Sequence, residues 1–242
     1  MSVLMPGIEE RLQAVREALA AAERSAGRPA GSVVLAAVGK TFGPEAVEAC
    51  ARQGQRVFAE NYAQEGCDKI DWMRAKHPDL QLEWHFIGPL QANKTRMVAE
   101  RFDWVQSLDR LRIASRLSAQ RPEALPPLNV LIEVNIDGEA SKSGVSPDEL
   151  EALAAEVEKL PRLRLRGLMA IPAPASDEAG RRKPLAAMKA LFDAFRSRHP
   201  EADTLSMGMS ADMREAVEEG ATMVRIGSAI FGPRSYPKKA GA

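Results

Sequence analysis

Short, nearly continuous apolar runs alternate with amphipathic segments along the whole chain. Continuous apolar runs are typical of parallel strands, because both faces of such a strand are buried. The predicted strands are Val33–Val38, Arg56–Glu60, Glu83–Gly88, Trp104–Leu108, Val130–Ile136, Leu165–Ile171, Thr204–Met209 and Met223–Ile226.

Helical patterns fill the gaps between these runs. Apolar residues recur at three- and four-residue spacing, and Ser146 with Glu149 three residues later resembles a capping box. The predicted helices are Ile8–Ala26, Pro44–Cys50, Gln91–Arg101, Arg110–Gln120, Pro147–Leu160, Lys183–His199 and Ala211–Glu219.

Strands that alternate with helices predict a parallel α/β sheet, and eight such units suffice to close a (β/α)₈ or TIM barrel. The helix over Ile8–Ala26 precedes the first strand and is an addition to that barrel. We expect one domain over residues 1–242, since barrels of ~200–250 residues commonly form a single domain. A doubly wound open sheet is the alternative, but such sheets usually carry a glycine-rich dinucleotide turn, and none follows the first strand here.

Charge and composition exclude several classes of protein. Lys and Arg number 33, as do Asp and Glu, and this balance favours neither nucleic acid nor a membrane surface as a partner. No secretory signal opens the sequence, and no run approaches the ~18 apolar residues of a membrane span. Two cysteines are too few for a disulfide framework, so we expect a cytoplasmic protein. The three histidines have no metal-ligand spacing, so we expect no metal.

The residues that end the first two strands carry candidate chemistry, because barrel enzymes bind their ligands at the carboxyl ends of the strands. Lys40 follows the first strand directly. Burial lowers the pKa of a lysine and so frees the neutral amine that attacks an aldehyde. Asn61 follows the second strand and offers donors and an acceptor to a ligand ring. The alternatives are a surface lysine in a loop and a helix-capping asparagine.

Two other polar positions favour structural roles. His85 lies within the apolar run of the third strand, which indicates a hydrogen-bonded core histidine rather than a catalytic base. Ser141-Lys142-Ser143-Gly144 after the fifth strand could suggest an anion-binding loop. A helix does not follow it at once, so a solvated loop is the better interpretation.

Small residues follow the last two strands. Ser210 comes after Gly208 and Met209, and Gly227-Ser228 leads into another helical turn. Helix starts after strands seven and eight match the usual phosphate site of barrel enzymes, although a serine there can also be a simple helix cap.

Arg225, within the eighth strand, needs an acceptor, either a structural carboxylate or a ligand atom. A phosphate cradle, a reactive lysine and an arginine at one cavity fit pyridoxal 5′-phosphate (PLP), but they also fit a sugar-phosphate aldolase.

Several of these segments resemble the pyridoxal phosphate homeostasis protein family, and the resemblance extends from about Val33 to Tyr236. The family has the barrel of the alanine racemase N-terminal domain, which is the type III fold of PLP proteins, so the resemblance favours PLP over an aldolase. The matching segments are Ala37–Thr41, Phe58–Tyr62, Trp84–Gln91, Gly167–Ile171, Leu205–Ser210 and Val224–Gly232.

The resemblance also implies roles for individual residues. Lys40 would form a Schiff base with PLP, Asn61 would contact its ring, and Arg225 would face the pyridine nitrogen. The phosphate would be held by Ser210, Gly227 and Ser228 with the backbone near Met209. Two positions depart from the usual family sequence: Gly39 replaces a serine, and Ser228 replaces a threonine but keeps the hydroxyl.

The family is regarded as a non-catalytic carrier or buffer of PLP. An arginine at the pyridine nitrogen keeps it unprotonated and weakens PLP as an electron sink. Alanine racemases have a further domain that supplies a second base, whereas this barrel should close near Gly232 and the chain ends at Ala242. We therefore expect a monomeric PLP carrier without catalytic residues. The alternatives are a small amino-acid racemase and a regulator that delivers PLP to apo-enzymes.

Overall fold

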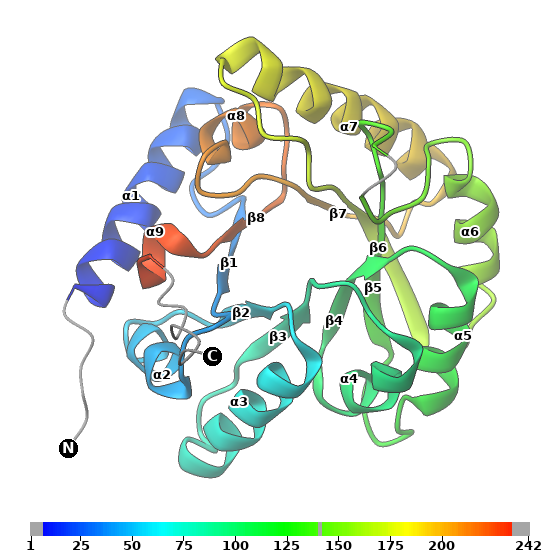
Figure 1. Ribbon diagram of the computed structural model, residues 1–242. Helices are drawn as coiled ribbons and strands as arrows, with labels where there is room; N and C mark the ends of the chain where they lie inside the picture. Colours follow the sequence, from blue (N-terminus) through cyan, green and yellow to red (C-terminus); the bar gives the residue numbers. More distant parts are fainter. Residues whose placement is uncertain (1–6, 140–141, 234–242) are drawn as a thin grey trace, which may run out of the picture.

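The computed structural model describes residues 7–139 and 142–233, and within this range eight parallel strands pair in chain order and close into a barrel (Figure 1). The last strand pairs with the first, so that Val34 lies opposite Met223 and Ala37 opposite Ile226. The strands are β1 (Val34–Val38), β2 (Val57–Glu60), β3 (Glu83–Phe86), β4 (Trp104–Leu108), β5 (Leu128–Glu133), β6 (Leu163–Met169), β7 (Thr204–Ser206) and β8 (Met223–Ile226).

Helices form the outer ring around this barrel (Figure 1). The additional first helix contacts both α8 and α9 and so covers the seam where the barrel closes. The helical elements are α1 (Ile8–Ser25), α2 (Pro44–Arg52), α3 (Ala63–Lys76), η1 (Ala92–Lys94), α4 (Thr95–Arg101), α5 (Leu111–Gln120), α6 (Leu150–Val157), α7 (Glu178–Arg198), α8 (Met213–Glu218) and α9 (Ser228–Phe231).

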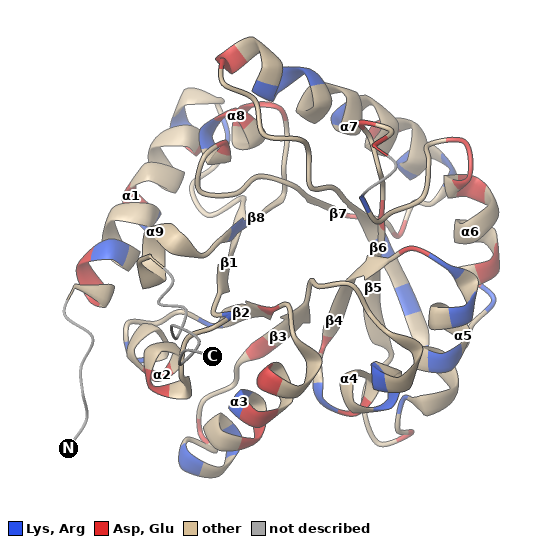
Figure 2. Ribbon diagram, in the orientation of Figure 1, with Lys and Arg blue, Asp and Glu red and all other residues tan. Residues whose placement is uncertain are grey.

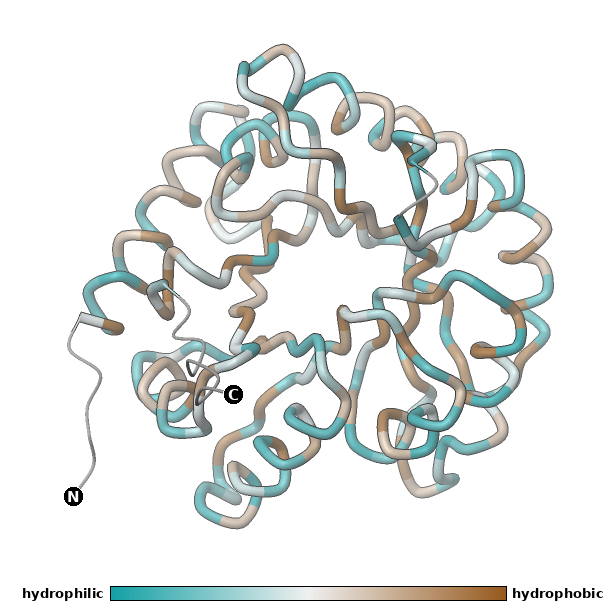
Figure 3. Tube along the Cα trace, viewed as in Figure 1, coloured by the Kyte–Doolittle hydropathy of each residue, from teal (hydrophilic) through white to brown (hydrophobic). Residues whose placement is uncertain are grey.

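Burial explains why these sequences form strands. Hydrophobic residues recur along the strands of the ring (Figure 3), while charged residues of both signs are distributed over the outer helices (Figure 2). The main core lies between strands and helices. Two smaller apolar clusters are separate from this core: one contains Ala36 and Ala59, and the other contains Trp104 and Leu131. Burial of both strand faces accounts for the continuous apolar runs.

A row of buried polar groups links strands on opposite sides of the ring. Arg225 donates to Ser206 Oγ (2.7 Å), which donates to Gln106 Oε1 (2.6 Å), and Gln106 Nε2 donates to His85 Nδ1 (2.7 Å). His85 Nε2 therefore carries the proton that it donates to Glu83 (2.7 Å). His85 is fully buried, stacks on Trp104, and is the core histidine that the sequence predicts.

All eight predicted strands are present, but the ends of several differ from the prediction. The third and seventh strands stop at Phe86 and Ser206, although the apolar runs continue to Ile87 and Met207. Those two residues are still buried, and their N–H groups donate to the neighbouring strands, from Ile87 to Glu60 O (2.9 Å) and from Met207 to Met223 O (3.2 Å), so the apolar pattern follows burial slightly beyond the strand ends.

The helices differ more from the prediction. The sequence analysis predicted no helix at α3, whose apolar stripe is interrupted by Gly66 and charged residues. Helix α7 begins earlier than predicted, at Glu178, where Asp177 caps it by accepting a hydrogen bond from Gly180 N (2.7 Å). Helix α6 begins at Leu150, and Glu149 accepts hydrogen bonds from both the backbone and the hydroxyl of Ser146 (3.0 and 2.8 Å).

Candidate functional site

Lys40 lies in a tight turn at the end of β1. The turn is closed by a hydrogen bond from Phe42 N–H to Gly39 O (3.1 Å), and Gly39 N–H donates to Ala59 O on β2 (3.0 Å). Thr41 has φ = 70°, which is a left-handed conformation that a β-branched residue rarely adopts. Lys40 is half-buried. The turn thus carries backbone strain beside the candidate reactive lysine.

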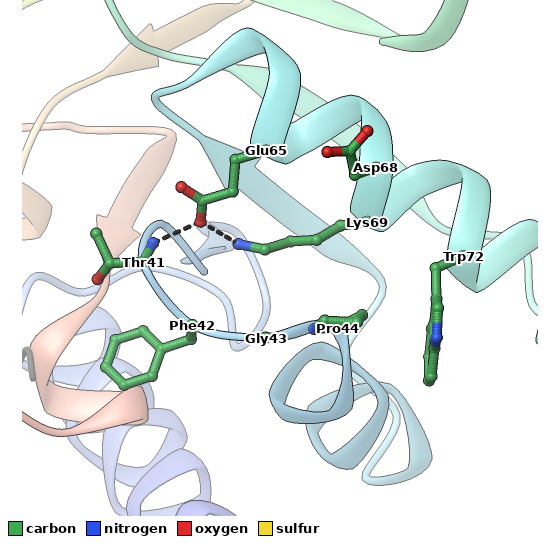
Figure 4. Close-up of a pocket in the computed structure, with 8 residues that line it drawn as sticks. All are labelled: Thr41, Phe42, Gly43, Pro44, Glu65, Asp68, Lys69 and Trp72. Carbon is green, nitrogen blue, oxygen red and sulfur yellow. Dashed lines mark hydrogen bonds and ion pairs between the residues drawn. The ribbon is translucent and has the colours of Figure 1, made fainter. Parts of the chain in front are cut away.

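A largely buried charged cluster, formed by Glu60, Glu65 and Lys69, supports this turn, and Figure 4 draws Glu65 and Lys69 beside Thr41. The Lys69 ammonium donates to Gly39 O (2.8 Å), Glu60 Oε1 (2.8 Å) and Glu65 Oε1 (2.6 Å). Glu65 Oε1 also accepts the Thr41 N–H (2.6 Å). Burial raises the pKa of Glu60 to about 7, against the opposing attraction of Lys69. The sequence analysis missed this cluster, for which the i, i+4 spacing of Glu65 and Lys69 was the available signal.

Asn61 follows β2 directly, as predicted, and its side chain is partly unsatisfied. Its Oδ1 is buried and has no hydrogen-bond partner among the described residues. Helix α3 begins at Ala63 with Tyr62 as its N-cap, so Asn61 is not the capping residue. Asn61 also lines a cavity of ≈180 Å³ together with Glu133 and Lys142. A polar group without a partner at a cavity is suited to meet a ligand.

Ser210 and Ser228 bring two hydroxyl groups together from the ends of β7 and β8. Their Oγ atoms lie 3.5 Å apart, and both residues remain accessible. Gly208 is essential to this loop, because it has φ = 96° and an added Cβ would lie 2.4 Å from the Ala216 side chain. Gly227 passes close to β1, where a Cβ would lie 3.3 Å from Val38 O. The paired hydroxyls are donors that fit a phosphate group.

The helix starts near these serines differ in detail from the prediction. Helix α8 begins at Met213 with Asp212 as its N-cap, so Ser210 lies before the helix and does not cap it. Met209 N–H donates to Asp212 Oδ1 (2.7 Å) and is already occupied. Ser228 does begin α9, where the first N–H groups of a helix have no intrahelical acceptor. Both helices are short, so an anion at this place would be bound by hydroxyl and N–H donors rather than by a helix dipole.

Arg225 is buried, with 3% of its surface exposed, and points to neutral partners. It donates to Ser206 Oγ (2.7 Å) and to Ala170 O (2.9 Å). Within the described residues no carboxylate lies within 4.0 Å of it, so a direct structural ion pair is absent from this part of the chain. Burial lowers the pKa of Arg225 to about 10, which leaves the guanidinium charged at neutral pH.

Glu133, the last residue of β5, is a further acidic group that the sequence analysis missed. It is 7% exposed and lines the same cavity as Asn61. Burial, helped by the negative charge of Asp109 and opposed by Arg225, raises the pKa of Glu133 to about 7. A carboxyl group that ends an apolar strand was the signal available in the sequence.

The barrel brings most of the predicted residues to one region. Lys40, Asn61, Ser210 and Ser228 follow β1, β2, β7 and β8, which are adjacent strands in the closed ring. No group of His, Cys, Asp and Glu able to hold a metal ion occurs in residues 7–139 and 142–233. In the same residues, no helix is long and apolar enough to cross a membrane.

Comparison with known proteins places the chain among PLP-related proteins. The model of the alanine racemase N-terminal domain family matches residues 11–235. The pyridoxal phosphate homeostasis protein of Vibrio cholerae is 50% identical over 236 residues, which cover 98% of this chain and 100% of that protein. The protein of the same name from Escherichia coli K12 is 53% identical over 235 residues, with coverage of 97% and 100%.

Solved structures of related proteins are also similar to this chain. PipY of Synechococcus elongatus with PLP bound is 32% identical, with a TM-score of 0.78 and coverage of 93% of this chain and 100% of PipY. A protein of unknown function from Bifidobacterium adolescentis is 32% identical, with a TM-score of 0.88 and coverage of 95% and 98%. Alanine racemase of Corynebacterium glutamicum is 16% identical with a TM-score of 0.67, and the match covers 94% of this chain and 63% of the racemase. That last likeness shows the fold alone.

Replacement of Glu133 by glutamine should remove part of the pH dependence of stability. The folded-state pKa of about 7 lies above the ~4.3 of an unfolded chain, so the folded protein keeps a proton that the unfolded chain releases. Wild-type stability should therefore fall as pH rises from about 4.5 to 7, by up to ~3 kcal/mol from this group.

Urea unfolding at pH 4 and pH 8 checks this expectation. Glu133→Gln should match the wild type at pH 4 and exceed its stability at pH 8, while Glu123→Gln, at an exposed position, should follow the wild type at both. If Glu133→Gln and the wild type lost the same free energy of unfolding between the low and the high pH, the predicted role of Glu133 would be contradicted.

Proposed function

This chain belongs to the alanine racemase N-terminal domain family, and on that premise we propose that it binds PLP as a Schiff base on Lys40 and serves intracellular PLP homeostasis. The observation that carries the proposal is the meeting of a lysine turn and a pair of hydroxyl groups on adjacent strands. PipY, similar over its full length, has PLP bound, and the curated relatives are PLP homeostasis proteins.

Each site residue has a role that fits its surroundings. PLP supplies an aldehyde and, once bound, an electron-withdrawing ring. Lys40 would hold the cofactor through its amine, which condenses with an aldehyde with loss of one water. Ser210, Gly227 and Ser228 would hold the phosphate, with Met209 shaping the loop.

Two further side chains would face the pyridine ring of PLP. The Asn61 amide, whose Oδ1 has no partner among the described residues, would contact the PLP ring at the mouth of the barrel. Arg225 would face the pyridine nitrogen while Ser206 and Ala170 hold its guanidinium in place.

The charge of Arg225 supports a carrier rather than a catalyst. A cation at the pyridine nitrogen disfavours protonation there, and an unprotonated ring stabilises a carbanion poorly. We infer a cytoplasmic, monomeric protein with one domain over residues 1–242 that buffers PLP and exchanges it with amines, including those of apo-enzymes.

An amino-acid racemase activity is the second candidate. Glu133 favours it, because a carboxyl group with a pKa of about 7 at the mouth of the barrel is suited to proton transfer. The structural likeness to alanine racemases supports only a common fold. The two candidates differ in whether an amino acid loses its α-proton at the site.

The Schiff base should map to Lys40. Purified protein loaded with PLP should absorb near ~420 nm, and borohydride should fix the pyridoxyl group on the peptide that contains Lys40. Lys40→Ala should abolish the fixed pyridoxyl group. Lys94→Ala is the control and should retain it, because Lys94 only shares the lining of a separate cavity with Asn61. Mass spectrometry that finds the group mainly on another lysine would refute the assignment.

The serine hydroxyls should act on the phosphate. Ser210→Ala and Ser228→Ala should each weaken PLP binding by ~1–2 kcal/mol, because each removes a hydrogen bond to a charged group. Pyridoxal, which lacks the phosphate, should bind all three proteins almost equally. Equal losses for PLP and pyridoxal in a titration would show that the serines act on protein structure instead.

The loaded protein should show no appreciable racemase, transaminase or decarboxylase turnover. The charged Arg225 leaves the ring a weak electron sink, so an α-proton should not be removed at a useful rate. Incubation with common L-amino acids in deuterated water, followed by NMR and chiral analysis, checks this. Multiple turnovers of α-proton exchange that Lys40→Ala eliminates would establish the enzyme instead.

A further inference from the structure

The turn that carries Lys40 is held in a costly conformation. Thr41, the next residue, has φ = 70°, where a β-branched side chain crowds its own backbone. Such a conformation persists only when surrounding contacts determine it. The hydrogen bond from Phe42 N–H to Gly39 O belongs to the turn itself, so the remaining restraint must come from other elements.

The charged cluster of Glu60, Glu65 and Lys69 supplies that restraint from β2 and α3. All three ammonium hydrogens of Lys69 have an acceptor, and one of these acceptors is the Gly39 carbonyl at the start of the turn. Glu65 holds the other end through the Thr41 N–H (2.6 Å). Figure 4 shows Glu65 between Thr41 and Lys69. The backbone on both sides of Lys40 is therefore attached to one ion cluster.

The burial of charged groups in this cluster indicates a role other than stabilising the fold. Lys69 is 3% exposed and Glu60 is fully buried, and burial of such charges is an inefficient way to stabilise a fold. Gly39 makes room for it, since a Cβ at that position would lie 2.8 Å from Glu60 Oε1. One residue is thus left without a side chain so that a carboxylate can reach the base of the turn.

We propose that Glu65 and Lys69, with Glu60, are positioning residues that fix the Gly39–Thr41 turn so that the Lys40 amine is aligned with the PLP aldehyde. This inference rests on the proposed Schiff base on Lys40. The cluster does not touch the cofactor. It acts on the rate at which Lys40 forms the C=N bond and releases water, because small errors in alignment reduce the rate of bond formation steeply.

Glu65→Ala is the test variant. Lys69→Met would leave Glu60 as an uncompensated buried charge and could prevent folding, whereas Glu65 is partly exposed near the start of α3. Asp68→Ala is the matched control. Asp68 lies on the same helix and lines, together with Thr41 and Glu65, the cavity drawn in Figure 4. It is exposed and accepts a hydrogen bond from Gln64. Glu65→Gln retains an acceptor for Thr41 N–H and should therefore keep part of the wild-type rate of Schiff-base formation.

Stopped-flow absorbance should show Schiff-base formation about tenfold slower in Glu65→Ala, as expected for loss of a charge-assisted hydrogen bond. Asp68→Ala should stay within about twofold of wild type, and Glu65→Gln should be intermediate. An analogue of PLP without the aldehyde should bind all four proteins with affinities within about twofold, because the phosphate cradle is unchanged. Without PLP, amide exchange at Thr41 should accelerate in Glu65→Ala alone.

Equal rates of Schiff-base formation in Glu65→Ala and Asp68→Ala would overturn the inference. A parallel loss of affinity for the aldehyde-free analogue would also overturn it, because the residue would then support the whole site. A wild-type protein that binds PLP without forming a Schiff base on Lys40 would instead refute the proposed function, and the inference with it.

Discussion

Hydrogen bonding between the first and the last strand is the constraint on which the site depends. The ladder from Val34–Met223 to Ala37–Ile226 joins segments almost two hundred residues apart in the chain. It brings the end of β1, with Lys40, beside the end of β8, with Ser228. An open sheet with the same strands would leave the Lys40 turn and Ser228 at opposite edges. Helix α1 covers this seam and so protects the ladder that joins the two halves of the site.

The sequence was sufficient to predict the ring and the residues at its mouth, because both follow from local patterns. Buried parallel strands are continuous apolar runs, and residues such as Lys40 and Asn61 stand directly after them. Strand ends were less predictable, since Ile87 and Met207 are buried and hydrogen-bonded to a neighbouring strand although β3 and β7 end one residue before them. The capping role weighed for Ser210 depended on where α8 begins, and Asp212 proved to be the cap.

The parts that the sequence analysis missed are long-range pairs. Lys69 resembles an ordinary helix lysine until β2 and the turn after β1 are brought against it. Glu133 resembles the polar end of a strand until closure of the ring encloses it near Arg225. For Arg225 the sequence left a structural carboxylate and a ligand atom open as acceptors, and it did not indicate the hydroxyl of Ser206 and the carbonyl of Ala170 that accept its hydrogen bonds. Such arrangements depend on tertiary contacts between different strands and helices.

A protein that handles a reactive aldehyde must also keep its other nucleophiles from competing for it. Burial raises the pKa of Cys50 to about 12 and that of Cys67 to about 11, so both thiols stay protonated and unreactive at neutral pH. Lys69 lies close to the Lys40 turn, but its side chain is 3% exposed and its nitrogen donates hydrogen bonds to three acceptors, which enclose it and keep it from an aldehyde. The ion cluster beneath the turn therefore also provides chemical selectivity between two neighbouring amines.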